Sequence, residues 1–191
     1  MMLGTNDSAE SGPNGSPVSP EDYGENLKTI IGKLHSNYPD ALFIVNYPIW
    51  YSPNTHNGAV YLEGGLNRLK SYHPVIDQVV AELQGQGLQI WTGSKEAFDF
   101  FEDKPEYFIA ENGYDGIFYL HPNAVGAENL GHIWAGSIYE HLPSGDGIES
   151  VTMEMPADAA VYTLQGQRIY DTQHLAPGLY IVGGRKVVVI R

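Results

Sequence analysis

The segment ALFIVNYPIW, residues 41–50, decides the fold class of this chain. It is an almost continuous apolar run, which is typical of a strand buried on both faces, as in a parallel sheet. A helix is predicted before it, over residues 19–39, because Ser19 can cap a helix and Pro20 suits its first position. A shorter predicted strand, GLQIW, follows at residues 87–91. This alternation predicts an α/β fold in which helices cover a parallel sheet.

The remaining segments of this region add a loop and two helices. Residues 52–65 are polar and contain glycine, so we expect a loop that lies over the sheet edge and forms part of a site. A helical pattern follows over residues 66–83, where Pro74 is expected to kink or restart the helix. The last helix is predicted to begin near Ala124, with Asn123 as its cap.

The composition argues against several classes of function. The 191 residues include 23 Asp and Glu against 10 Lys and Arg, a formal charge of -13. This charge repels nucleic acid and anionic membrane surfaces, so neither is expected as a partner. There is no cysteine, and the seven histidines show no metal-ligand spacing, so we predict no metal site and no cofactor. No apolar run is long enough for a membrane span, and no export signal is recognised at the N-terminus.

Two polar residues are candidates for chemistry. Asn6, in the motif GTND at residues 4–7, follows a short apolar segment and could direct its amide at a ligand above the sheet. The same four letters are also common in simple turns. His121, in the motif HPN at residues 121–123, lies on the predicted loop before the last helix and could act as a general base. The alternative is a loop histidine that only packs or caps.

Taken together, the two motifs resemble the SGNH, or GDSL-like, hydrolase family of serine esterases. GTND is similar to the family's third block, whose Asn donates to the oxyanion hole, and HPN is similar to its fifth block, which carries the base. The resemblance covers residues 1–142. It implies a three-layer α/β/α sandwich and an ester hydrolase that removes acetyl groups from carbohydrate, with Asn6 and His121 as catalytic residues.

Two departures from the family pattern are apparent. The family usually has an Asp three residues before the histidine; this chain has Phe118 there, and Asp115 is the nearest carboxylate upstream. Asp115 or a backbone carbonyl is therefore expected to orient His121. No serine occurs in the family's GDS context, so no nucleophile is assigned and the chain alone is predicted to be inactive. Because only three apolar residues precede Gly4, we expect the chain to be the latter part of a larger, N-terminally truncated protein.

The aromatic residues after the first long strand suggest a carbohydrate ligand. Three aromatic residues, Trp50, Tyr51 and Tyr61, flank the predicted loop and could stack on a sugar, although aromatic residues there could equally belong to the core. Trp50 and Tyr51 are the predicted substrate-binding residues. A carbohydrate ester is thus the expected substrate. The competing hypothesis is a non-catalytic module, either carbohydrate-binding or displayed at the cell surface, that uses the site without turnover. A third possibility is a truncated gene product with no independent role.

The character of the sequence changes at PSGDG, residues 143–147. We predict one domain over residues 1–142, a linker over 143–149 and a small all-β tail over 150–191. Glycines 183 and 184 suit a hairpin turn between two strand-like runs of this tail. The tail also resembles the C-terminal sorting domains of secreted Bacteroidetes proteins. That resemblance implies a parent protein in the periplasm, at the cell surface or in the medium, with secretion machinery as a partner of the tail.

Overall fold

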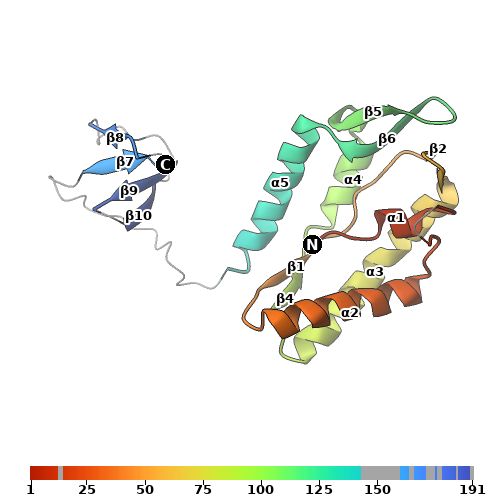
Figure 1. Ribbon diagram of the computed structural model, residues 1–191, viewed down its shortest axis with the longest axis horizontal. Coiled ribbons are helices and arrows are strands. Elements are labelled where there is room, and N and C mark those ends of the chain that lie inside the picture. Colours follow the sequence, from red (N-terminus) through yellow and green to blue (C-terminus); the bar gives the residue numbers. More distant parts are fainter. Residues whose placement is uncertain are drawn as a thin grey trace. The chain divides into compact units, whose positions relative to one another are not determined.

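The computed structural model describes two compact units, Met1–His141 and Leu142–Arg191 (Figure 1). The described residues are 1–12, 15–142, 160–163, 166–170, 175, 178–183 and 185–189. Helices and small sheets occur together in the described residues, so the predicted mixed α/β class is confirmed.

The first unit contains five α-helices, one 3-10 helix and six strands in the described residues. In chain order these are α1 (Thr5–Ser8), α2 (Pro20–Asn37), β1 (Phe43–Val45), β2 (Asn54–His56), β3 (Ala59–Tyr61), α3 (Glu63–Gly85), β4 (Ile90–Thr92), α4 (Glu96–Glu102), η1 (Pro105–Tyr107), β5 (Phe108–Asn112), β6 (Ile117–Pro122) and α5 (Ala124–Tyr139).

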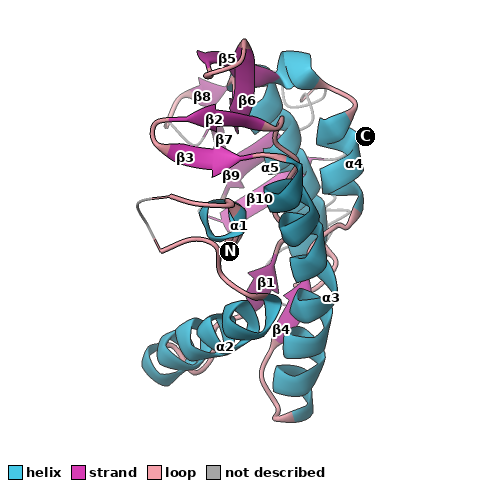
Figure 2. Ribbon diagram, turned by 90° about the vertical axis from the view of Figure 1, so that its right-hand side faces the viewer, coloured by secondary structure: helices cyan, strands magenta, loops and turns pink. Residues whose placement is uncertain are grey.

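The apolar run at residues 41–50 forms the predicted parallel strand, but only its first part pairs. β1 lies parallel to β4, with Phe43 opposite Ile90, and Met2 makes an isolated parallel bridge to Asn46. Residues 46–49 continue as buried, irregular backbone, because Pro48 has no N–H to donate to a ladder. Figure 2 shows β1 and β4 close to the helices α2 and α3.

Of the two long helices, α2 begins as its sequence predicts, whereas α3 differs from the prediction. In α2 the Ser19 side chain accepts a hydrogen bond from the backbone N–H of Asp22, and Pro20 occupies the first position, as predicted. Residues that face α3 and the strands are buried, among them Leu27 and Ile31. α3 continues through Pro74 as one helix, so the expected restart does not occur.

The segment 52–65 is a β-hairpin followed by the first turn of α3, so the loop prediction is wrong. β2 and β3 pair antiparallel, with Asn54 opposite Tyr61. Asn57 and Gly58 lie between them with φ of 50° and 79°, the left-handed conformation that a tight two-residue turn requires. A second hairpin, β5–β6, carries His121, and the described residues show no complete three-layer sandwich.

The second unit contains one antiparallel sheet among its described residues. The strand order is β10 (Arg185–Val189), β9 (Gly178–Val182), β7 (Val161–Thr163) and β8 (Arg168–Ile169). β9 and β10 pair with Val182 opposite Arg185, which is the hairpin predicted at glycines 183 and 184. The predicted linker at residues 143–149 lies outside the described residues. Across the described helices, none is long and apolar enough to cross a bilayer.

Candidate functional site

Asn6 and His121, far apart in the sequence, line the same pocket of the first unit. The pocket has a volume of about 210 Å³. Its walls come from the N-terminal segment with α1, from the chain after β1 and from the end of β6. The lining residues are Met2, Thr5, Asn6, Ile49, Trp50, Leu120, His121 and Pro122. Most of the wall is apolar, which is typical of a ligand site with a few polar groups that set orientation.

Asn6 is held with its side-chain oxygen turned to the protein. The hydroxyl of Tyr61, on β3, donates a hydrogen bond of 3.0 Å to Oδ1 of Asn6. The amide nitrogen Nδ2 has no acceptor among the described residues, so it remains able to donate to a ligand. The sequence suggested Tyr61 as a residue that could stack on a sugar. In the structure its ring is buried and its hydroxyl bonds to Asn6, a contact that depends on the β2–β3 hairpin.

The turn that carries Asn6 rests on a pair of buried tyrosines. Gly4 has a φ of 115° and lies against the rings of Tyr23 and Tyr72, which stack with centroids 4.1 Å apart. Burial and the nearby Asp7 carboxylate raise the pKa of both tyrosines above the usual range, so both hydroxyls stay protonated and donate to backbone carbonyls. Burial also raises the pKa of Asp7 itself.

His121 is hydrogen-bonded to a carboxylate that the sequence reasoning missed. Its Nδ1 lies 2.6 Å from Oε1 of Glu111, which belongs to the neighbouring strand β5. The imidazole side chain is 65% exposed, whereas that of Glu111 is 18% exposed. A carboxylate only accepts, so Nδ1 carries the proton in this bond. In the neutral ring Nε2 is then the basic nitrogen, as general base catalysis requires.

Asp115, expected to orient His121, has another role. It lies in the turn between β5 and β6, where its backbone N–H donates to Oδ1 of Asn54 and its carbonyl accepts from the Asn54 amide nitrogen. No hydrogen bond or ion pair of its carboxylate is found among the described residues. The carboxylate that bonds to His121 is Glu111, because the chain reverses at Asp115 and brings β5 alongside β6.

An irregular register explains how Glu111 reaches His121. Glu111 pairs with Phe118, so their side chains lie on the same face of the hairpin. In a regular ladder residues 120 and 122 of β6 would share this face, and His121 would lie on the other. The register shifts between Phe108 and Ala110, whose partners Pro122 and Tyr119 are three residues apart instead of two. One extra residue on β6 thus changes the face of His121. A prediction of residues 108–122 as a hairpin could have suggested a cross-strand partner for His121, but it could not have predicted the register shift.

The two aromatic residues predicted to bind substrate have different environments. Trp50 lines the pocket and packs edge-on against Phe108, with ring centroids 5.7 Å apart. Tyr51 has no exposed surface, and its hydroxyl bonds with that of the buried Ser8. Burial raises the pKa of Tyr51 to about 12. Tyr51 therefore belongs to the core and offers no ring face to a sugar, whereas Trp50 remains in the candidate site.

No serine among the described residues lines this pocket. Thr5 is the one described lining residue with a hydroxyl, and no hydrogen bond joins it to His121. Ser8, the nearest serine in sequence to Asn6, is buried and donates to the Thr5 carbonyl. Among the described residues, no group of three or more His, Asp or Glu side chains is arranged to hold a metal ion.

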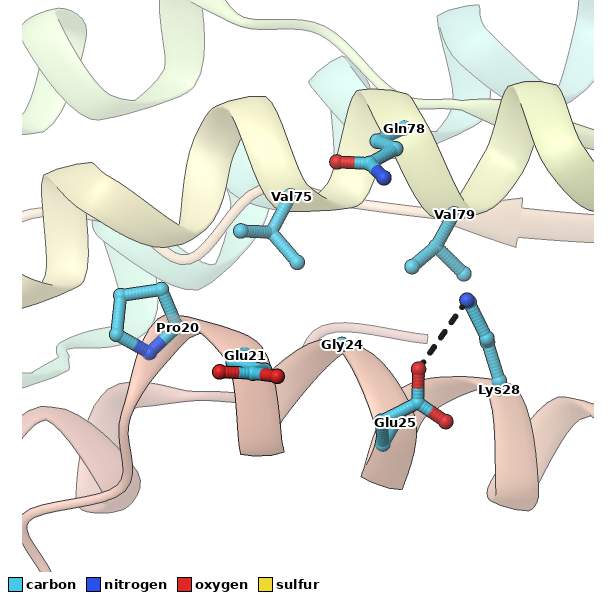
Figure 3. A pocket seen from close by; sticks show the side chains of 8 residues that line it. All are labelled: Pro20, Glu21, Gly24, Glu25, Lys28, Val75, Gln78 and Val79. Carbon is cyan, nitrogen blue, oxygen red and sulfur yellow. Dashed lines mark hydrogen bonds and ion pairs between the residues drawn. The ribbon is translucent and has the colours of Figure 1, made fainter.

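A second hollow lies between α2 and α3 and has a volume of about 230 Å³ (Figure 3). Its one basic residue, Lys28, forms ion pairs with Glu25 at 3.3 Å and Glu82 at 2.7 Å. Val75 and Val79 form the opposite wall. Lys28 is thus paired with carboxylates, and Glu21 is the one lining carboxylate with no ion pair among the described residues.

No family model, curated protein or solved structure was found to match this chain.

Proposed function

We propose that the first unit supplies the oxyanion donor and the general base of an SGNH-type ester hydrolase. The observation that supports this most directly is that Asn6 and His121 line one pocket, with His121 bonded through Nδ1 to Glu111. An ester carbonyl gains negative charge on its oxygen when a hydroxyl attacks it. A preorganised amide donor such as Asn6 typically contributes about two to three powers of ten in rate at that oxygen.

The nucleophile of the proposed reaction is a serine, and the described residues place none in the pocket. His121 would take the serine proton at Nε2 and return it to the leaving alcohol, while Glu111 stabilises the imidazolium that forms. This chain alone is accordingly proposed to bind its ligand without turnover. The three-layer sandwich stays part of this proposal, and the parallel pairing of β1 with β4 and the parallel Met2 bridge are what supports it.

An acetylated carbohydrate is the proposed ligand. The pocket is small and mostly apolar, which suits an acetyl group, and the Trp50 indole can pack on a sugar ring. Losing the acetyl carbonyl would remove the acceptor for the Asn6 amide. One neutral hydrogen bond contributes about 1 kcal/mol, so the deacetylated sugar should bind about fivefold more weakly.

This difference can be measured by titrating the isotope-labelled chain with acetylated xylo-oligosaccharides and with the same mixture after saponification. We expect the Asn6 amide and Trp50 indole resonances to shift with the acetylated probe, about fivefold tighter than with the saponified one, and no acetate to be released. Asn6→Leu should remove the preference. Asn129→Leu is the matched control, because Asn129 bonds only the Val125 carbonyl on the surface of α5.

Equal binding of both probes would favour the alternative, a non-catalytic carbohydrate-binding module. Binding that leaves Asn6 and Trp50 unaffected would contradict the assignment of the site. Acetate release that survives His121→Ala would contradict the role of His121, and release lost with that change would reveal a nucleophile already present in the chain.

We further propose that the second unit directs export in a Bacteroidetes host. Support comes from its likeness to C-terminal sorting domains. The test compares the full chain, given an export signal, with the same chain ending at residue 142. We expect the full chain at the cell surface or in the medium and the shorter chain in the periplasm. The same location for both would contradict a sorting role.

A further inference from the structure

The carboxylate of Glu111 contacts two imidazoles, one at each oxygen. Oε1 lies 2.6 Å from Nδ1 of His121, and Oε2 lies 2.9 Å from Nε2 of His56. His56 ends β2, in a different hairpin from the other two residues. This contact therefore ties the β5–β6 hairpin, which carries the candidate base, to a second part of the fold.

His56 is the more firmly held of the two histidines. Its side chain is 14% exposed, and its ring lies 5.3 Å from the ring of the buried Phe118. Its Nδ1 is 3.0 Å from the backbone carbonyl of Asn112. His121, by contrast, is largely exposed and has Glu111 as its one hydrogen-bond partner among the described residues. An exposed side chain with one bond depends on the position of that partner.

The hydrogen bonds of His56 define when it can hold Glu111. Both of its nitrogens face acceptors, the Asn112 carbonyl and the Glu111 carboxylate, so the ring makes both bonds when each nitrogen carries a proton. The amide nitrogen of Asn57 lies 2.7 Å from the same Nε2 and can donate to it only when that nitrogen is unprotonated. Glu111 and Asn57 thus compete for Nε2. Of the described side chains in contact with His56, Glu111 is the charged one.

We propose that His56 is a positioning residue for the candidate base: it holds one oxygen of Glu111 so that the other faces Nδ1 of His121. Without it, the carboxylate would turn freely about its side-chain bonds, and the Glu111–His121 bond would be made for less of the time. The inference rests on the proposed function only in calling His121 the base. The arrangement itself is testable without any ester.

The test is the Nδ1 proton of His121, observed by NMR at about pH 5.5, where an ordinary imidazole carries both protons in about nine of ten molecules. We expect a resonance moved downfield by the short bond to Glu111 in the wild-type protein. His56→Phe keeps an aromatic ring against Phe118 but removes both donors. It should move the resonance upfield and raise its exchange rate with water at least about fivefold. His56→Gln, which retains an amide donor for Glu111, should restore most of the wild-type signal.

The controls separate positioning from a general effect on the fold. Glu111→Gln defines the signal when the charged partner of His121 is lost, and His132→Phe makes the matched change at an exposed histidine of α5. His132→Phe should leave the His121 proton as in the wild type. An unchanged proton in His56→Phe would overturn the proposal, as would a failure of His56→Gln to restore it. None of these NMR measurements depends on ester hydrolysis. The positioning role of His56 can therefore be refuted while the proposed function stands, and the proposed function can be refuted while the positioning role stands.

Discussion

Gly126→Ala should destabilise the first unit by about 3 kcal/mol, because the added methyl group meets a backbone atom that has little room to move. A Cβ at Gly126 would lie 2.1 Å from the Tyr107 carbonyl oxygen and 3.2 Å from Cβ of Pro122. That same carbonyl accepts a hydrogen bond from the Asn123 N–H. Relief would therefore require α5 to move away from the strand end that carries His121. Urea unfolding, followed by circular dichroism, measures the change.

Two other glycines of α5 provide the matched controls. Gly131 and Gly136 have nothing within 4 Å of an added Cβ. Alanine at either position should raise the free energy of unfolding by about 0.5–1 kcal/mol, since glycine is a poor helix former. If Gly126→Ala unfolds at the same urea concentration as these variants, the close packing of α5 on Tyr107 is not a feature of the protein in solution.

Gly4→Ala should cost about 3 kcal/mol for a different reason, a combination of backbone strain and overpacking. Gly4 has a φ of 115°, which L side chains rarely adopt, and an added Cβ would lie 3.1 Å from the rings of both Tyr23 and Tyr72. These rings are buried and stacked, so neither can turn aside without opening the core. The variant should also disturb the Asn6 amide resonance, because Gly4 begins the turn that carries Asn6.

Gly32→Ala, in α2, is the control for this change. Gly32 has open space around an added Cβ and helical backbone, so alanine there should raise the free energy of unfolding by about 0.5–1 kcal/mol, as at Gly131 and Gly136. Equal urea midpoints for Gly4→Ala and Gly32→Ala would mean that the turn before Asn6 can adopt another conformation. In that case the Asn6 amide resonance of Gly4→Ala reports more directly than the urea midpoint on whether the site is disturbed.

Several features of the fold were predictable because their causes are local. The Ser19 and Asn123 caps depend on a side chain that reaches a backbone N–H three residues later, and both are observed. The buried character of residues 41–50 follows from their uninterrupted apolarity. The β2–β3 hairpin was missed although its signal, Asn57-Gly58 before the apolar Ala59–Tyr61, is local too; the polar residues 52–57 suggested a loop.

The candidate site likewise has features that the sequence predicts and features that depend on the tertiary structure. Sequence alone determined which residue types were present for chemistry: Asn6 and His121 were identified from their motifs, and Trp50 from its place after a buried strand. The tertiary structure decided which of these meet, bringing all three to one pocket and leaving Tyr51 in the core. It also replaced Asp115 with Glu111 and joined His56 to it. The physical reason is that partners across a hairpin depend on strand register, and a single extra residue in β6 changes the face on which His121 lies.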